Sequence, residues 1–187
     1  MDKVNSEFNI DFSWLASGVE YENRLGLAVF FLNKQGFCKN SEHVLLSSLN
    51  EEHEFENNLG CKIFNKEPDG FLHLSEFNSD DHFCKKIVIN LDFVPFYCKE
   101  ILFFLYNSLN VFDDLQNFEE IKIRHNNSNF VHVPEKNCKL VRLGSLVRTS
   151  IDLDKEFFFS KELSSLNLDL VEIAKSFKIN IFCENKV

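Results

Sequence analysis

An almost unbroken apolar run from Gly26 to Leu32 places the strongest constraint on the fold of this chain. The run reads Gly-Leu-Ala-Val-Phe-Phe-Leu, which is too short for a typical helix and rich in residues that favour strands. A strand with one face in water would carry polar residues at every second position, and this run carries none. The sequence therefore predicts a central strand that is buried on both faces.

Other short segments predict further strands. Residues 8–14 alternate apolar and polar side chains, the period-two pattern of a strand with one buried face. Asn33 to Gly36 supplies a turn, in which Gly36 is suited to a positive φ. An acidic, Asn-rich stretch over 50–58 is predicted to be a surface loop. More strands are predicted over 44–47, 61–64, 71–74, 87–91, 100–106, 119–124 and 139–143, the last two resembling exposed edge strands.

Near the C-terminal end the apolar spacing changes. Over residues 161–180, apolar side chains recur every three or four positions, which predicts an amphipathic helix. Many short strands separated by turns imply a two-sheet sandwich. A chain of 187 residues can bury one sizeable core, whereas two domains would each be small. We therefore expect residues 1–187 to form a single, mostly β, two-sheet β-sandwich with a C-terminal helix.

Composition limits the possible partners and the location. The net charge of −9 is spread along the chain, which argues against binding to nucleic acid. The sequence has no 18-residue apolar run, so we expect no membrane insertion. Residues 1–7 have neither the basic start nor the apolar core of a signal peptide, and we expect a cytoplasmic protein.

Cysteine and phenylalanine are both frequent. The six cysteines lie at wide, unequal intervals, and in a chain without an export signal we expect reduced thiols, several of them in the core. Most of the 22 phenylalanines are expected to fill the core.

Several short motifs occur in an order that is typical of one family. Each motif alone is common, so the evidence lies in their order and spacing. They are Trp14, the strand 28–33 that ends in Leu-Asn, Gly36, the Pro-Asp-Gly turn 68–70 followed by His73, the acidic pair Asp80-Asp81, the strand 87–91, and Val94-Pro95. Together with weaker matches at 117–124 and 149–151, they resemble the TerD family of tellurium-resistance and stress proteins over most of residues 12–151. The resemblance implies a TerD-type sandwich.

The resemblance also implies a calcium site, which this chain retains only in part. Calcium needs six to eight oxygen ligands on flexible loops. Where the family carries Asp-Leu-Asp before its second strand, this chain has residues 24–27, Arg-Leu-Gly-Leu. In the second loop, residues 75–81, the family's glycines are missing, and the oxygen-bearing residues that remain are Glu76, Asn78, Asp80 and Asp81. We expect a degenerate site with calcium binding diminished or lost. If calcium binds, Asp80 and Asp81 are the expected core ligands.

The resemblance implies a non-enzymatic bacterial binding or scaffold protein, with other proteins of a stress-response assembly as partners. An alternative is a metal-free β-sandwich adaptor or secretion-associated protein that binds through an aromatic surface. Phe93, Phe96 and Tyr97 are the candidate partner-binding residues, because consecutive aromatic side chains cannot all face one side of a strand. The run Phe157 to Phe159 fits either such a surface or a buried strand.

Enzymatic function is not expected. The sequence has no Gly-x-Ser-x-Gly motif and no Gly-rich phosphate loop. A third possibility is a zinc or thiol site. His82 and Cys84 with His73 or His43 would supply zinc ligands, and a reactive thiol would be one of Cys38, Cys84 and Cys98.

Overall fold

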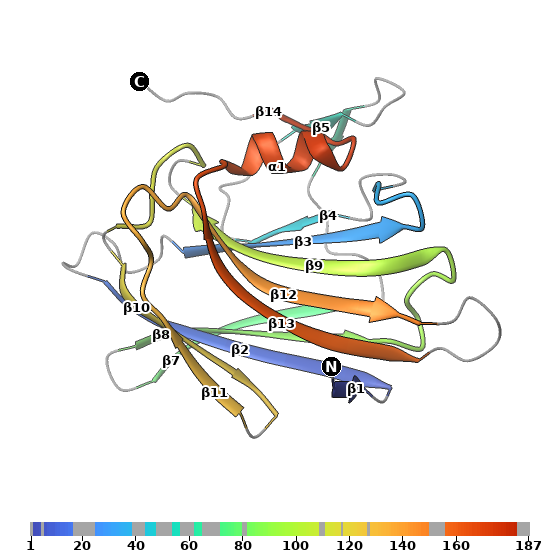
Figure 1. The fold of residues 1–187 in the computed structure, drawn as a ribbon, viewed down its shortest axis with the longest axis horizontal. Coiled ribbons are helices and arrows are strands. Elements are labelled where there is room, and N and C mark those ends of the chain that lie inside the picture. Colours follow the sequence, from blue (N-terminus) through green and yellow to red (C-terminus); the bar gives the residue numbers. More distant parts are fainter. Residues whose placement is uncertain are drawn as a thin grey trace.

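The computed structural model describes residues 2–4, 6–16, 25–38, 44–47, 54–56, 62–64, 72–79, 82–108, 111–116, 118–126, 128–149 and 156–182. These residues form antiparallel strands and a short helix (Figure 1). The elements are β1 (Asp2–Val4), β2 (Glu7–Ala16), β3 (Leu25–Asn33), β4 (Val44–Leu46), β5 (Glu54–Glu56), β6 (Lys62–Phe64), β7 (Leu72–Ser79), β8 (His82–Asn90), β9 (Cys98–Asn107), β10 (Phe118–His125), β11 (Ser128–His132), β12 (Leu140–Arg148), β13 (Phe157–Leu166), α1 (Leu170–Ser176) and β14 (Asn180–Phe182).

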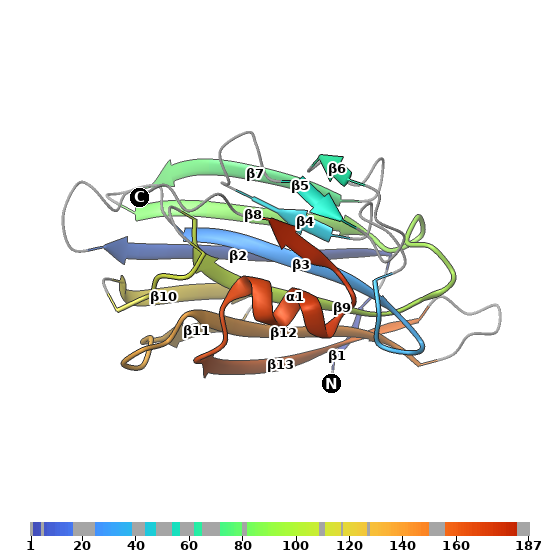
Figure 2. The same cartoon turned by 90° about the horizontal axis from the view of Figure 1, so that it is seen from above.

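Two large sheets and one small sheet are stacked. The six-stranded sheet has the order β1-β13-β12-β9-β3-β4, and the five-stranded sheet has the order β11-β10-β2-β8-β7. A small sheet, β14-β5-β6, lies with α1 on the side of the six-stranded sheet that faces away from the five-stranded sheet (Figures 1 and 2). The predicted β-sandwich with a helix near the C-terminal end is therefore confirmed.

The six-stranded sheet is covered on both faces, which explains the apolar run in β3. Leu27, Val29 and Phe31 belong to the core between the two large sheets. Ala28, Phe30 and Leu32 belong to a second core, which α1 covers with Leu170 and Ala174. Since successive residues of a strand point to opposite faces, β3 needs apolar side chains at every position. The prediction of an interior strand buried on both faces is confirmed.

A close contact between β3 and β9 requires glycine at position 26. A Cβ atom there would lie 2.3 Å from the Tyr106 ring, far inside van der Waals contact. The Tyr106 hydroxyl is buried and donates a 2.6 Å hydrogen bond to the carbonyl oxygen of Ser47. The Ser47 hydroxyl in turn accepts a 2.9 Å hydrogen bond from the backbone N–H of Leu27. These contacts fix the residue after β4 against the start of β3.

Two strands that were predicted to be exposed edges are interior strands instead. β10 lies between β11 and β2, and β12 lies between β13 and β9. The prediction was wrong because alternation reports which face of a strand is covered, whereas the pairing of its edges depends on distant segments. In β12 most residues are buried, and the contacts of its two arginines are described below.

The predicted loop and helix boundaries also need correction. Residues 54–56, inside the predicted loop, form β5, which pairs with β6 and β14. The predicted helix over 161–180 is confined to Leu170–Ser176, because β13 continues to Leu166. Asp169 caps the helix by accepting a 2.9 Å hydrogen bond from the N–H of Glu172, whose carboxylate accepts one from the N–H of Asp169. This reciprocal cap starts the helix at Leu170, nine residues after the predicted start.

Other predictions are confirmed. The side chains of Phe8, Ile10, Phe12 and Trp14 in β2 are buried. Gly36 has a φ of 80° in the turn after β3. Phe157 and Phe159 are buried in β13, so the run 157–159 belongs to a covered strand.

The turn 68–70 lies outside the described residues. No helix among the described residues is long and apolar enough to span a membrane.

Candidate functional site

The predicted calcium ligands do not lie together on a described loop. The backbone of Glu76 and of Asn78 belongs to β7, where these residues pair with Lys85 and Phe83 of β8. The loop predicted over 75–81 is therefore a strand as far as Ser79. Asp80 and Asp81 lie outside the described residues, and calcium binding stays a prediction. At the other expected calcium position, Gly26 and Leu27 are buried in β3.

The zinc and thiol alternatives stay predictions, because His43 lies outside the described residues and Cys84 is half-buried. Within the ranges that the structure describes, no three His, Cys, Asp or Glu side chains are grouped as metal ligands would be. Cys38, Cys98 and Cys138 are buried, as expected for core residues. Burial raises the pKa of Cys98 from 9.0 to about 12, and it raises the pKa of Cys38 further. Such thiols stay protonated near neutral pH and are poor nucleophiles.

The predicted partner-binding residues lie on the connection between β8 and β9. Leu91 and Val94 are buried and anchor this connection in the core between the sheets. The side chains of Phe93 and Phe96 face solvent instead, and they are 65% and 78% exposed. Tyr97 is half-buried, with its ring centroid 5.8 Å from that of Phe96 in an edge-to-face arrangement. The structure therefore presents two large aromatic side chains to water on one short loop.

Arg148, the last residue of β12, holds this loop in place. Its side chain is buried, and its guanidinium group donates hydrogen bonds to three consecutive carbonyl oxygens. The bond to Phe96 is 2.7 Å long, and those to Val94 and Pro95 are both 3.3 Å. The guanidinium carbon also lies 4.6 Å from the centroid of the Phe157 ring. Burial lowers the pKa of Arg148 from its usual value, because the charged form loses hydration.

A hollow of about 340 Å³ lies beside the exposed aromatic residues. It is lined by residues 33–35, which follow β3, by residues 96–99, which lead into β9, and by Arg148. In the antiparallel order β12-β9-β3, the end of β12, the start of β9 and the end of β3 meet at one end of the sheet. We refer to these lining residues as the Arg148 hollow.

The second loop of the Arg148 hollow is also fixed by hydrogen bonds. The side-chain oxygen of Asn33 accepts hydrogen bonds from the N–H groups of Gln35 at 2.9 Å and Phe37 at 3.1 Å. The backbone N–H of Gly36 donates to the carbonyl oxygen of Asn33 at 2.9 Å. Both walls of the hollow are therefore ordered before any partner arrives.

Sequence reasoning found the aromatic residues of this site but missed its basic ones. Lys34 lies in a turn whose composition gave no functional signal, and Lys99 and Arg148 each lie at one end of a largely apolar strand. Lys99 donates a hydrogen bond from its ammonium group to the carbonyl oxygen of Arg148, which ties β9 to β12. This grouping arises only from strand pairing, because Lys99 and Arg148 are 49 positions apart.

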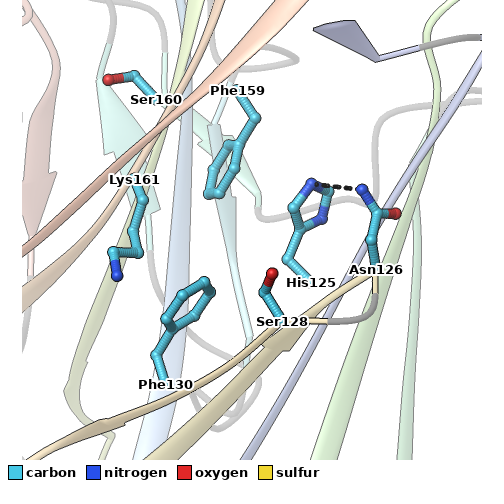
Figure 3. Close-up of a pocket in the computed structure, with 7 residues that line it drawn as sticks. All are labelled: His125, Asn126, Ser128, Phe130, Phe159, Ser160 and Lys161. Carbon is cyan, nitrogen blue, oxygen red and sulfur yellow. Dashed lines mark hydrogen bonds between the residues drawn. The ribbon is translucent and has the colours of Figure 1, made fainter. Parts of the chain in front are cut away.

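A second hollow, of about 250 Å³, lies between the rims of the two large sheets. The buried ring of His125 packs against Phe159, with ring centroids 4.6 Å apart. Its Nδ1 lies 2.8 Å from the carbonyl oxygen of Asn9, and its Nε2 lies 3.1 Å from the side-chain nitrogen of Asn126. The Lys161 ammonium lies 3.7 Å from the centroid of the Phe130 ring (Figure 3). The polar groups of His125 and Lys161 are thus engaged within the protein, and this hollow is the weaker candidate.

Comparison with known proteins places the fold. No protein-family model and no curated protein matches the sequence. Among solved structures, a homologue of the telluride resistance protein TerD from Streptomyces coelicolor A3(2) superposes with a TM-score of 0.58. The match covers 90% of this chain and 95% of that one, at 12% sequence identity. The chain has a TerD-like fold.

A second solved structure supports the same conclusion. SAV2460, a protein of unknown function, matches with a TM-score of 0.57, covering 90% of this chain and 94% of its own, at 11% identity. The order of sequence motifs indicated a resemblance to TerD, and the tertiary structure has the same fold. The sequence itself is divergent from both solved structures.

Proposed function

We propose that this TerD-like protein is a non-enzymatic, cytoplasmic binding or scaffold module of the tellurium-resistance and stress-response class. It docks another protein through the loop that carries Phe93, Phe96 and Tyr97, together with the adjoining Arg148 hollow. Calcium is not required for this docking, because the site lies at the sheet end defined by β3, β9 and β12 and uses none of the predicted calcium ligands.

The exposure of Phe93 and Phe96 is the observation that supports this proposal. Full burial of a Phe side chain contributes roughly 1.5–3 kcal/mol, so two Phe side chains left in water forgo a substantial stabilisation. The loop is not loosely packed, since Leu91 and Val94 anchor it and Arg148 bonds its carbonyl groups. Aromatic side chains and arginine around an ordered hollow are typical of the residues that dominate protein interfaces.

The buried thiols support a non-catalytic role. Cys98 lines the proposed surface and carries a thiol, which is a potential nucleophile. Burial raises the pKa of this thiol and keeps it protonated. Its Sγ donates a weak hydrogen bond of 3.5 Å to the carbonyl oxygen of Glu100, and no described His side chain lines the Arg148 hollow. The described residues of this hollow therefore form no Cys–His pair.

Photo-crosslinking followed by affinity measurement tests the proposal. A photoreactive phenylalanine analogue at position 96 is used in cells to capture and identify the partner, which is then purified. Its affinity is measured by calorimetry for the native protein and for the Phe93→Ser/Phe96→Ser variant. We expect at least a tenfold loss, because residues at the centre of an interface each contribute about 2 kcal/mol.

The matched control uses apolar side chains exposed on a different sheet. Val131 and Val133 are 58% and 64% exposed, and a Val131→Ser/Val133→Ser variant removes a comparable apolar surface near β11. We expect this variant to bind the partner as the native protein does. Equal affinity of the native and Phe93→Ser/Phe96→Ser proteins would contradict the proposed docking surface.

A further inference from the structure

We infer that the segment docked at the Arg148 hollow is an acidic peptide that carries an aromatic or large aliphatic side chain. The inference rests on the proposed docking function, and it specifies the chemistry of the partner. The net charge of this chain, −9, would by itself disfavour an acidic partner, so the inference depends on the local charge at the hollow.

The lining of the hollow is basic. It includes Lys34, Lys99 and Arg148, and none of its described residues is Asp or Glu. Among the described residues, no carboxylate lies within ion-pair distance of any of these three side chains, although six other ion pairs are formed elsewhere. Glu100, the next acid along β9, lies 4.0 Å from Arg142 on the neighbouring strand. Three positive charges without a counter-charge among the described residues give this end of the sandwich a local potential opposite to the charge of the whole chain.

The burial of Arg148 strengthens this potential. Its charge is shielded from water, and its hydrogen-bond partners are neutral carbonyl groups, so the positive charge is not cancelled. An anion at the mouth of the hollow would interact with Arg148 through a medium less polar than water, in which charges interact more strongly. Lys34 is exposed at the rim and can contact a carboxylate directly.

One wall of the hollow is largely apolar and suits a single large side chain. Phe96, Tyr97 and Cys98 form one wall, and the volume of about 340 Å³ is at the lower end of the range for ligand pockets. Asn33 and Arg148 hold the two loops in place, so binding costs little ordering of the surface. A partner with carboxylates next to one apolar anchor would match both the charge and the shape.

An anionic membrane is the competing occupant, and the shape of the site disfavours it. A bilayer surface would meet the exposed rings of Phe93 and Phe96 but would not fill a hollow beside them. Lys99 is half-buried and is turned toward the carbonyl oxygen of Arg148, not outward as a lipid-binding lysine would be. A peptide side chain can enter the hollow while its neighbouring carboxylates meet Lys34.

Selection from a displayed library of random twelve-residue peptides tests the inference. The full-length protein is immobilised, and the selected peptides are sequenced, synthesised and measured by fluorescence anisotropy at low and high salt. We expect enrichment of Asp and Glu beside a Phe, Tyr, Trp or Leu, with affinity that falls as salt rises. We also expect binding to be lost in the Phe93→Ser/Phe96→Ser variant.

Charge variants then locate the acidic contact. The Lys34→Glu/Lys99→Gln variant is expected to bind the selected peptides about tenfold more weakly. The control Lys136→Glu/Lys175→Gln makes the same change in net charge at exposed positions elsewhere, and we expect it to bind as the native protein does. Lys34→Glu alone, at an exposed position, reports on the contact if the change at Lys99 disturbs β9.

The other outcomes are distinguishable. Selected peptides that lack acidic residues, or that bind the charge variants unchanged, would overturn the acidic partner and leave the docking function standing. No enrichment over an immobilised Phe93→Ser/Phe96→Ser protein would overturn both. Co-sedimentation with phosphatidylserine-containing vesicles that needs Phe93 and Phe96, without peptide binding, would replace the peptide by a membrane.

Discussion

Replacement of Arg148 by methionine is expected to destabilise the protein by about 2–3 kcal/mol. The 2.7 Å hydrogen bond from the guanidinium to the carbonyl oxygen of Phe96 contributes about 2 kcal/mol, since the donor is charged. The two bonds of 3.3 Å are long and contribute about 0.5 kcal/mol each. The contact with the Phe157 ring adds about 1 kcal/mol. Against these losses, methionine avoids a cost of about 1–2 kcal/mol, because it has no charge that loses hydration on burial.

Thermal unfolding and hydrogen exchange measure this effect. For a chain of this length, each kcal/mol lowers the Tm by about 2–4 °C, so we expect a decrease of about 4–12 °C. Amide exchange over residues 93–98 should accelerate more than exchange in β3, because the lost bonds hold that loop. If the hydrogen bonds of Arg148 did not stabilise the loop, exchange over residues 93–98 would be unchanged.

The control is another arginine of the same strand. Arg142 is half-buried, and its guanidinium lies 3.0 Å from the carboxylate of Glu162, whose side chain is 53% exposed. Such a pair contributes less than about 1 kcal/mol, so Arg142→Met should lower the Tm only slightly. An equal Tm for Arg148→Met and Arg142→Met, with unchanged exchange over 93–98, would refute the reasoning.

Three further predictions concern the packing, the buried thiols and the metal. Gly26→Ala places a Cβ 2.3 Å from the Tyr106 ring, so chemical denaturation should show a loss of at least about 1–3 kcal/mol, and wild-type stability would mean that the ring can move aside. The pKa of the Cys98 thiol is about 12 in the folded protein and 9.0 when exposed, so above pH 9 the unfolded chain binds fewer protons and stability should fall as pH rises toward 12. This fall is about 1.4 kcal/mol per pH unit for one thiol, and a Cys98→Ala variant should show a shallower slope in denaturation curves at several pH values. Calorimetric titration of the chelator-treated protein should give no heat at micromolar calcium. Binding that disappears in the Asp80→Ala/Asp81→Ala variant would instead show that the calcium site is retained.

The candidate site was predicted from sequence only in part. Phe93, Phe96 and Tyr97 were recognisable because adjacent aromatic side chains cannot all be buried on one strand face, and the structure exposes two of them. The basic part of the site was not recognisable. Lys34, Lys99 and Arg148 come from three segments, and an arginine at the end of an apolar strand looks the same whether it is exposed or holds a distant loop.

The sequence by itself determined the class of fold, the interior strand β3 and the turn at Gly36. These features depend on local periodicity and on backbone preferences, which a short window of residues contains. Only the tertiary structure decided that β10 and β12 are interior strands and that α1 begins after Asp169. It also decided which charges gather at one end of the sandwich. Pairing between strands joins segments far apart in the chain, and the free energy of that pairing depends on the whole core, which no single segment encodes.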